Sequence, residues 1–167
     1  MPERPARLSR VAFRHFRPIA TRWIDNDVYG HVNNVVYYSW FDTAVNTYLI
    51  EGGVLEIGKS PTVGVVIESG CTYFESIAYP ETVEAGLAVT SLGRSSVRYA
   101  VGIFRQGGAF AAAQGHFVHV YVDRATQRPT EIPDEVRAKL EALAVRPDQF
   151  RAAPRSPPVE HAKEADR

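Results

Sequence analysis

The chain has 167 residues, and 45% of them are hydrophobic, which is enough to bury the core of one globular domain. Its 19 basic residues balance 19 acidic ones, so no overall field draws the protein to nucleic acid or to an anionic membrane surface. The N-terminus lacks the apolar stretch of a secretory signal, and no apolar run approaches a membrane span. We therefore expect a soluble cytoplasmic protein.

The first part of the chain predicts an arm and then a strand. Residues 1–10 are polar and rich in proline, so we expect a flexible arm. Residues 19–23 alternate, with Ile19, Thr21 and Trp23 on one face, and this pattern is typical of a strand. Two carboxylates, Asp25 and Asp27, follow directly.

After Gly30 the spacing of apolar residues changes to that of a helix. The residues that predict its buried side recur three or four positions apart: Tyr37, Phe41, Ala44, Val45 and Tyr48. Gly52 and Gly53 are expected to end the helix, because glycine takes the left-handed conformation without steric cost. About twenty residues give a rod of roughly 30 Å, long enough to cross a small domain.

The middle of the chain alternates with the period of β-structure. Strands are predicted within residues 63–73, 82–89, 96–103 and 110–122, and the short links between them favour antiparallel neighbours. A shorter helix should follow Pro133, with Val136, Leu140 and Leu143 on its buried side. These elements predict an α+β domain over residues 11–145, in which the long helix packs on one face of an antiparallel sheet, followed by a disordered tail over residues 146–167.

The two aspartates lie where catalysis by a carboxylate is chemically reasonable. An isolated pair with this spacing most often marks a turn or a helix cap. The alternative is that one carboxylate lies beside the helix N-terminus, whose free N–H groups stabilise negative charge. A carboxylate base with such an oxyanion site is the minimum set for hydrolysing an activated acyl group. His31 is open to three interpretations: a ligand, a proton carrier or a helix-start residue.

A family resemblance favours the catalytic interpretation. The run from Thr21 to Asp42, TRWIDNDVYGHVNNVVYYSWFD, resembles the start of the hotdog-fold thioesterases of the 4-hydroxybenzoyl-CoA and acyl-CoA thioesterase group. The shared pattern is a strand ending in D-x-D, then G-H-V-N-N, a tyrosine and a long helix. The resemblance implies a hotdog fold, in which an antiparallel sheet wraps around one long central helix. It also implies hydrolysis of an acyl-CoA to a carboxylic acid and free coenzyme A.

The resemblance also implies roles for individual residues. Asp27 would act as the nucleophile or as the base that activates water, and the backbone N–H of Asn34 would polarise the thioester carbonyl. Some relatives carry a histidine or tyrosine at the position of Asn34, so a role for that side chain does not transfer. His31 belongs to the G-H-V-N-N form of the motif, whose members resemble acyl-CoA thioesterases.

Substrate contacts are expected at two further places. Arg94 and Ser95 stand where the family grips the phosphates of coenzyme A, and a guanidinium and hydroxyls suit that task. Tyr37, on the long helix, is expected either to line the acyl pocket or to belong to the core. Coenzyme A is part of the substrate, so no separate cofactor is expected.

Two other functions remain open from sequence. A hotdog hydratase or dehydratase would fit the architecture, but its D-x-N-P-x-H motif is one residue longer than the Asp27–His31 spacing and contains a proline that this chain lacks. A non-catalytic acyl-thioester binding domain is the third hypothesis.

Partners and metals complete the expectations. An exposed sheet edge and the family resemblance both imply a homodimer with sites at its interface, and pairing into a homotetramer stays open. His116 and His119 lie three apart in a predicted strand, so they should point to opposite faces and form a poor metal pair. We expect no metal site.

Overall fold

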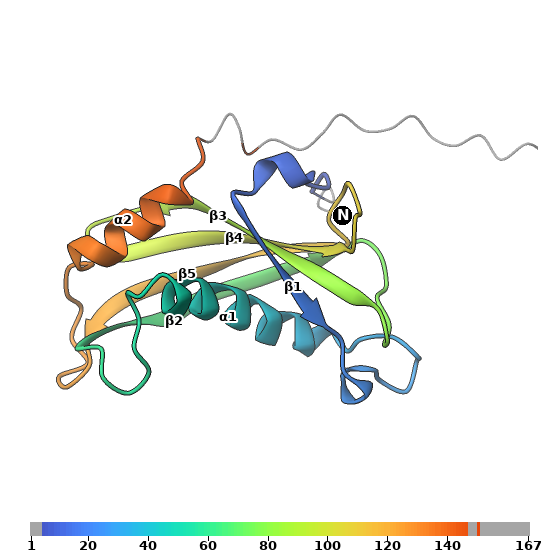
Figure 1. Cartoon of the computed structure of the whole chain (residues 1–167), viewed down its shortest axis with the longest axis horizontal. Helices are drawn as coiled ribbons and strands as arrows, with labels where there is room; N and C mark the ends of the chain where they lie inside the picture. Colours follow the sequence, from blue (N-terminus) through green and yellow to red (C-terminus); the bar gives the residue numbers. More distant parts are fainter. Residues whose placement is uncertain (1–4, 147–149, 151–167) are drawn as a thin grey trace, which may run out of the picture.

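The computed structural model describes residues 5–146 and residue 150, and it contains one five-stranded antiparallel sheet (Figure 1). The order of strands across the sheet is β1-β3-β4-β5-β2. In chain order the strands are β1 (His15–Ala20), β2 (Thr62–Tyr73), β3 (Thr82–Leu92), β4 (Ser96–Arg105) and β5 (Ala113–Asp123). The predicted α+β architecture is confirmed.

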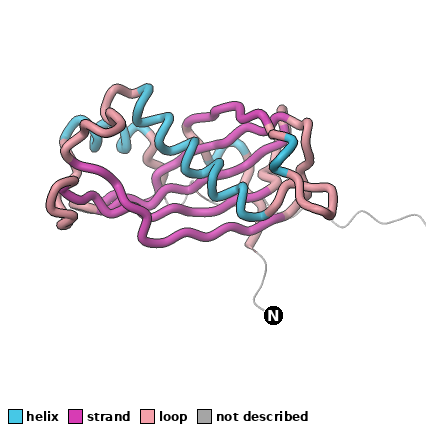
Figure 2. Tube along the Cα trace, turned by 90° about the horizontal axis from the view of Figure 1, so that it is seen from below, coloured by secondary structure: helices cyan, strands magenta, loops and turns pink. Residues whose placement is uncertain are grey.

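The long helix α1 (Asn34–Glu51) lies along one face of the sheet, as Figure 2 shows from below. Its sheet-facing side is buried, as the spacing of apolar residues predicted, and consists of Tyr37, Trp40, Phe41, Ala44, Val45 and Leu49. The helix ends where expected, because Gly53 takes the left-handed conformation with φ +74°. The helix N-terminus is thereby held at one fixed end of the sheet.

The second helix, α2 (Asp134–Ala142), closes the core at the other end of α1. Val136, Leu140 and Leu143 are buried, which confirms the predicted apolar side of this helix. Nearly all of the expected disordered tail lies outside the described residues.

The opposite face of the sheet is covered by the N-terminal segment. Leu8, Ala12 and Phe13 are buried there against Phe104 and Ala100, and the Leu8 N–H donates to Gln114 Oε1 at 2.8 Å. Leu8 and the residues that follow it therefore pack on the sheet, whereas Pro5 and Ala6 are exposed and residues 1–4 of the expected arm lie outside the described residues. The reason is that the outer face is itself apolar and needs a cover.

The first strand begins and ends earlier than the prediction of residues 19–23. After Ala20 the chain leaves the sheet and forms a short 3₁₀ helix, Trp23–Asp25. The Arg22 N–H donates to Asp25 Oδ2 at 2.7 Å, and this local bond bends the chain where alternation predicted extension.

The two edges of the sheet differ. Edge strand β1 has six residues and contains Pro18, which cannot donate to a further strand. Edge strand β2 has 12 residues, and Val66 and Ile67 are exposed at its centre, with Ile67 at 62%. Strand β2 therefore offers the longer open edge for pairing.

Candidate active site

The loop between the 3₁₀ helix and α1 is closed by its own backbone. An isolated bridge pairs Asn26 with Val32, and inside it the Asp27 N–H donates to the His31 carbonyl at 2.9 Å. Gly30, at φ +85°, supplies the left-handed residue that this tight turn needs. Asp27 is thus presented on a short, well-defined loop.

The two aspartates have different surroundings. Asp25 is 1% exposed and is held by Arg22, whose guanidinium lies 2.8 Å from Oδ1. The Asp27 side chain is 22% exposed, and its Oδ1 accepts the Tyr29 N–H at 2.9 Å. Asp25 is therefore tied into the fold, whereas Asp27 keeps acceptor capacity for a reacting group.

The start of α1 supplies backbone donors beside this loop. The N-cap residue Asn33 accepts the Val35 N–H on its side chain at 3.1 Å and the Val36 N–H on its carbonyl at 3.0 Å. Helix geometry leaves the first N–H groups without intrahelical acceptors. Asn33 already accepts the N–H groups of Val35 and Val36. The N–H of Asn34 is therefore the first-turn donor best placed to form a hydrogen bond with an anionic oxygen.

A pocket of about 260 Å³ adjoins this helix end. It brings together three of the residues singled out from sequence, His31, Asn34 and Tyr37, with the chain that follows β2, from Tyr73 to Ser76. The Tyr73 hydroxyl donates to the Asn34 carbonyl at 3.0 Å and so ties the end of β2 to the start of α1. Alternation placed Tyr73 in a strand, but no sequence signal connected it to the helix terminus.

His31 and Tyr37 contribute in different ways. His31 Nδ1 lies 3.9 Å from Asp27 Oδ1, too far for a direct hydrogen bond. Tyr37 is buried, and burial raises its pKa to about 12, so its hydroxyl stays protonated at neutral pH. It belongs to the core and also lines the pocket beside Asn34.

Arg94 and Ser95 lie far from Asp27 in the same chain. They line a separate pocket of about 280 Å³ on the turn between β3 and β4, where the Ser95 carbonyl accepts the Tyr121 N–H at 2.7 Å. Tyr121 is near the end of β5 that pairs with the start of β2, whereas the Asn34 pocket adjoins the end of β2. Arg94 also pairs with Glu131. One chain therefore does not bring these two residues to the carboxylate.

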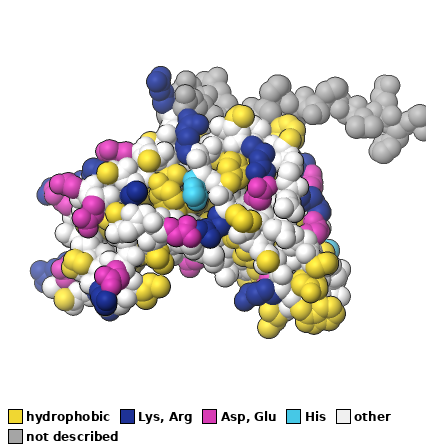
Figure 3. Space-filling view, viewed as in Figure 1, with side chains coloured by type: hydrophobic (Ala, Val, Ile, Leu, Met, Phe, Trp, Pro, Cys, Tyr) yellow, Lys and Arg dark blue, Asp and Glu magenta, His cyan; other side chains and the backbone are white. Residues whose placement is uncertain are grey.

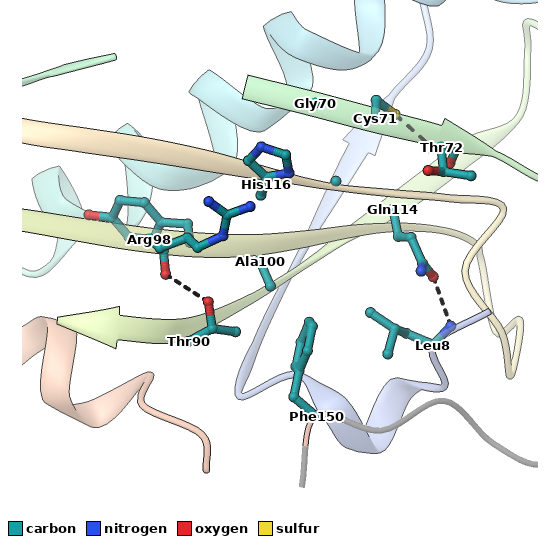
Figure 4. A pocket seen from close by; sticks show the side chains of 12 residues that line it. Leu8, Gly70, Cys71, Thr72, Thr90, Arg98, Ala100, Gln114, His116 and Phe150 are labelled. Carbon is teal, nitrogen blue, oxygen red and sulfur yellow. Dashed lines mark hydrogen bonds between the residues drawn. The ribbon is translucent and has the colours of Figure 1, made fainter. Parts of the chain in front are cut away.

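A larger pocket, of about 360 Å³, lies on the outer face of the sheet (Figure 4). Arg98 and His116 line it, and both contact Glu68, with Arg98 Nη1 at 3.0 Å and His116 Nε2 at 2.9 Å from Oε1. The Arg98 hydrogen bond lowers the pKa of Glu68. None of the catalytic or substrate-binding residues expected from sequence lines this pocket. His119 points to the other face and is buried beside Tyr99, which confirms that the two histidines diverge.

Exposed apolar side chains surround the Asp27 loop. They gather at the end of the molecule that carries the β1–α1 connection, at the lower right of Figure 3. The members of this apolar rim are Trp23, Ile24, Val28 and Tyr29, with Val28 at 94% exposure. An exposed apolar patch of this kind is typical of an interaction surface.

The described part of the chain contains neither a cluster of metal ligands nor a membrane-spanning helix. Within it, no group of three or more His, Cys, Asp or Glu side chains is placed to hold a metal ion. Its helices also include none long and apolar enough to cross a membrane.

Comparisons with known proteins agree with this architecture. Residues 21–140 match the sequence model of the Thioesterase-like superfamily. The PA5185 protein of Pseudomonas aeruginosa strain PAO1 is 53% identical, with a TM-score of 0.81 over 83% of this chain and 96% of that one. The PA2801 protein of Pseudomonas aeruginosa, named as a candidate thioesterase, is 30% identical, with a TM-score of 0.70 over 75% of this chain and 97% of that one. YsmA of Bacillus subtilis (strain 168) is 24% identical over 88 residues, and the match spans 53% of this chain and 59% of the length of YsmA.

Proposed function

Because the chain belongs to the thioesterase-like superfamily of hotdog-fold proteins, we propose that it hydrolyses an acyl-CoA to a carboxylic acid and free coenzyme A. The observation that carries the proposal is the Asp27 carboxylate, which is partly exposed on the short loop that leads into the N-terminus of α1. No cofactor takes part, and coenzyme A enters as half of the substrate.

Asp27 and the N-terminus of α1 have different roles in the proposed reaction. Asp27 attacks the thioester carbon itself or takes a proton from the water that does so. The Asn34 N–H donates to the carbonyl oxygen as negative charge develops on it, and a fixed backbone dipole stabilises that charge without reorienting. On the water route the C–S bond then breaks, and the thiolate takes the proton that Asp27 removed from water. On the nucleophilic route the thiolate leaves first, and water then hydrolyses the anhydride on Asp27, which frees the acid and supplies the proton of the thiol. His31 lines the same pocket and is proposed to orient the substrate there.

A second copy of the chain would supply the coenzyme A contacts. Antiparallel pairing of two β2 strands about their centre places the start of one strand beside the end of the other. The turn carrying Arg94 and Ser95 lies at the end of the sheet where β2 starts, and Asp27 lies where β2 ends. We therefore propose a homodimer in which Arg94 and Ser95 of one copy bind the phosphates while Asp27 of the other acts on the thioester.

The decisive experiment replaces Asp27 with asparagine and measures thiol release from a panel of acyl-CoA substrates. Asp27→Asn keeps the size of the side chain but removes the base, so turnover should fall by about 10² or more while the circular dichroism spectrum stays unchanged. Glu51→Gln makes the same charge change at the far end of α1, where Glu51 pairs with Arg17, and should retain activity.

Other outcomes would identify a different function. Near wild-type turnover in Asp27→Asn would refute the role of this carboxylate. Loss of the conjugated absorbance of an enoyl-CoA without thiol release would indicate hydration, and no reaction with any acyl-CoA would indicate a binding domain.

A further inference from the structure

The turn between β3 and β4 is held to the fold by its carbonyl groups. The Ser95 carbonyl accepts the Tyr121 N–H at 2.7 Å. Arg137 of α2, the helix beside this turn (Figure 1), donates to the carbonyls of Gly93 and Arg94 at 2.8 and 3.1 Å. The backbone of the turn is therefore fixed, whereas the Arg94 side chain extends into solvent with 81% exposure.

Glu131 is placed beside Arg94 by the backbone on either side of it. The Thr130 N–H donates to the Tyr121 carbonyl at 2.9 Å, and the Ile132 N–H donates to the Arg94 carbonyl at 3.0 Å. Ile132 is also buried. Both neighbours of Glu131 are thus fixed, and the Glu131 carboxylate pairs with the Arg94 guanidinium.

This ion pair lies in the pocket of about 280 Å³ that is proposed to receive the phosphates of coenzyme A. Pro129 and Thr130 line the pocket together with Glu131, Arg94 and Ser95. A carboxylate and a phosphate are both anionic acceptors, and both bind a guanidinium through the same N–H donors. A phosphate that binds Arg94 must therefore displace Glu131 or share the guanidinium with it.

The charges around the pocket decide the direction of the effect. Among the described residues, Arg94 and Glu131 are the charged side chains that line it, and their charges cancel. The Arg137 guanidinium donates to the carbonyls behind the turn. An exposed ion pair is weak, so a phosphate group can displace the carboxylate, but the displacement reduces the affinity for that phosphate.

We propose that Glu131 is an internal competitor for coenzyme A. Its carboxylate holds Arg94 in the free protein, and a phosphate group of the coenzyme displaces it. Glu131 thereby lowers the affinity of the protein for coenzyme A without contacting the acyl group, so the thiol product is released more easily. The inference rests on the proposed function, because coenzyme A is the molecule that brings the phosphate to Arg94.

The test measures the binding of coenzyme A to the full chain by calorimetric titration at low ionic strength, where an exposed charge pair is least screened. Glu131→Gln keeps the size of the side chain and should lower the dissociation constant about three- to fivefold, the range that an exposed pair supplies. Arg94→Gln should raise the dissociation constant. Adding Glu131→Gln to Arg94→Gln should have little further effect, because no guanidinium is left to release.

Glu51→Gln is the matched control. It removes an exposed carboxylate that also pairs with an arginine, Arg17, and it should leave the dissociation constant of coenzyme A unchanged. An equal gain in this variant would show that the effect comes from the net charge of the protein and would overturn the proposal.

Steady-state kinetics provide a readout that a structural role of Glu131 would not change. The substrate is an acyl thioester of pantetheine, which lacks the phosphates of coenzyme A. In Glu131→Gln the inhibition constant of free coenzyme A against this substrate should fall by the same three- to fivefold factor. The kcat and KM for the pantetheine thioester alone should not change.

Two further results would overturn the proposal. One is a dissociation constant of Glu131→Gln equal to or above that of wild type, and the other is the same gain with and without the Arg94 guanidinium. Failure of the proposed function has a different signature, since wild type would then release no thiol from any acyl-CoA while the binding comparison of the variants still stands. Wild type that binds no coenzyme A at all would overturn both.

Discussion

Asp25 and Asp27 are separated by one residue, and their neighbours decide what each can do. Arg22 binds Asp25 through its backbone N–H and its guanidinium, whereas Asp27 accepts the N–H of Tyr29 at the rim of the loop. Residue spacing alone could not choose between the two carboxylates, and the family resemblance was needed to favour Asp27. In the sequence, the structural role of Asp25 is indicated by Arg22, three positions before it.

Replacing Asp25 should therefore affect stability before chemistry. Asp25→Asn weakens the cap on the 3₁₀ helix and the bond to Arg22, and we expect the free energy of unfolding to fall by about 1–3 kcal/mol. The guanidinium of Arg22 is largely exposed and regains water, which keeps the loss at the lower end. Urea denaturation measures it, and Asp27→Asn under the same conditions should show little change.

His119 should make stability depend on pH. Its pKa is about 4 in the fold and 6.5 when the chain unfolds, so between these values the unfolded chain binds the extra proton. Stability from this residue is present above pH 6.5 and is lost as the pH falls toward 4. Between pH 7 and pH 5 the loss should be about 2 kcal/mol.

The measurement is the difference between wild type and His119→Gln in urea denaturation at both pH values. The variant should lose less stability on acidification, and the aromatic neighbours Tyr99 and Tyr121 do not titrate in this range. Identical pH dependence in the two proteins would contradict a neutral, buried His119.

At the scale of elements, the N-terminus of α1 is the feature that the site depends on. Asn33 caps the helix, and the Asn33 N–H donates to the Asp25 carbonyl at 2.8 Å. The Tyr73 hydroxyl donates to the Asn34 carbonyl. The cap, the 3₁₀ helix and β2 thus fix where the Asn34 N–H points.

Removal of the cap should weaken both the helix and the reaction. Asn33→Ala loses the bond to the Val35 N–H and should cost about 1 kcal/mol of stability. Thiol release should fall as well, because the donor at Asn34 is held less firmly. Asn33→Asp preserves the capping oxygen and should remain close to wild type in thermal denaturation; a loss as large as that of Asn33→Ala would argue against the cap.

Local periodicity predicted the helices and the last four strands, since each buries one face and repeats at its own period. The differences between prediction and structure arise from individual contacts that a local periodic pattern does not encode. Strand β1 ends at Ala20 because Arg22 and Asp25 form local hydrogen bonds. Leu8 is buried because it packs on a sheet face formed by residues far along the chain. The pocket formed by Tyr73 and Asn34 joins residues 39 positions apart, and no local pattern encodes it.

For the whole molecule, the open edge at β2 is the surface on which the proposed homodimer depends. Ile67→Arg puts a charge at the centre of that edge, where a second strand would cover it, and should separate the dimer in sedimentation experiments. Thiol release should fall in parallel. Val11→Arg places the same charge on an equally apolar, exposed position of the N-terminal segment and should leave the dimer and thiol release unchanged. If Val11→Arg dissociated the dimer and Ile67→Arg did not, the interface would lie at the N-terminal segment and not at β2.

Strand β2 ends at Tyr73, whose hydroxyl supports the first turn of α1. The strand that is open to a second copy therefore also steadies the proposed oxyanion donor. It follows that the rate per chain should depend on protein concentration, with specific activity falling on dilution as copies separate and recovering when the sample is concentrated again. A dilution series thus reports the dissociation constant of the assembly through catalysis alone.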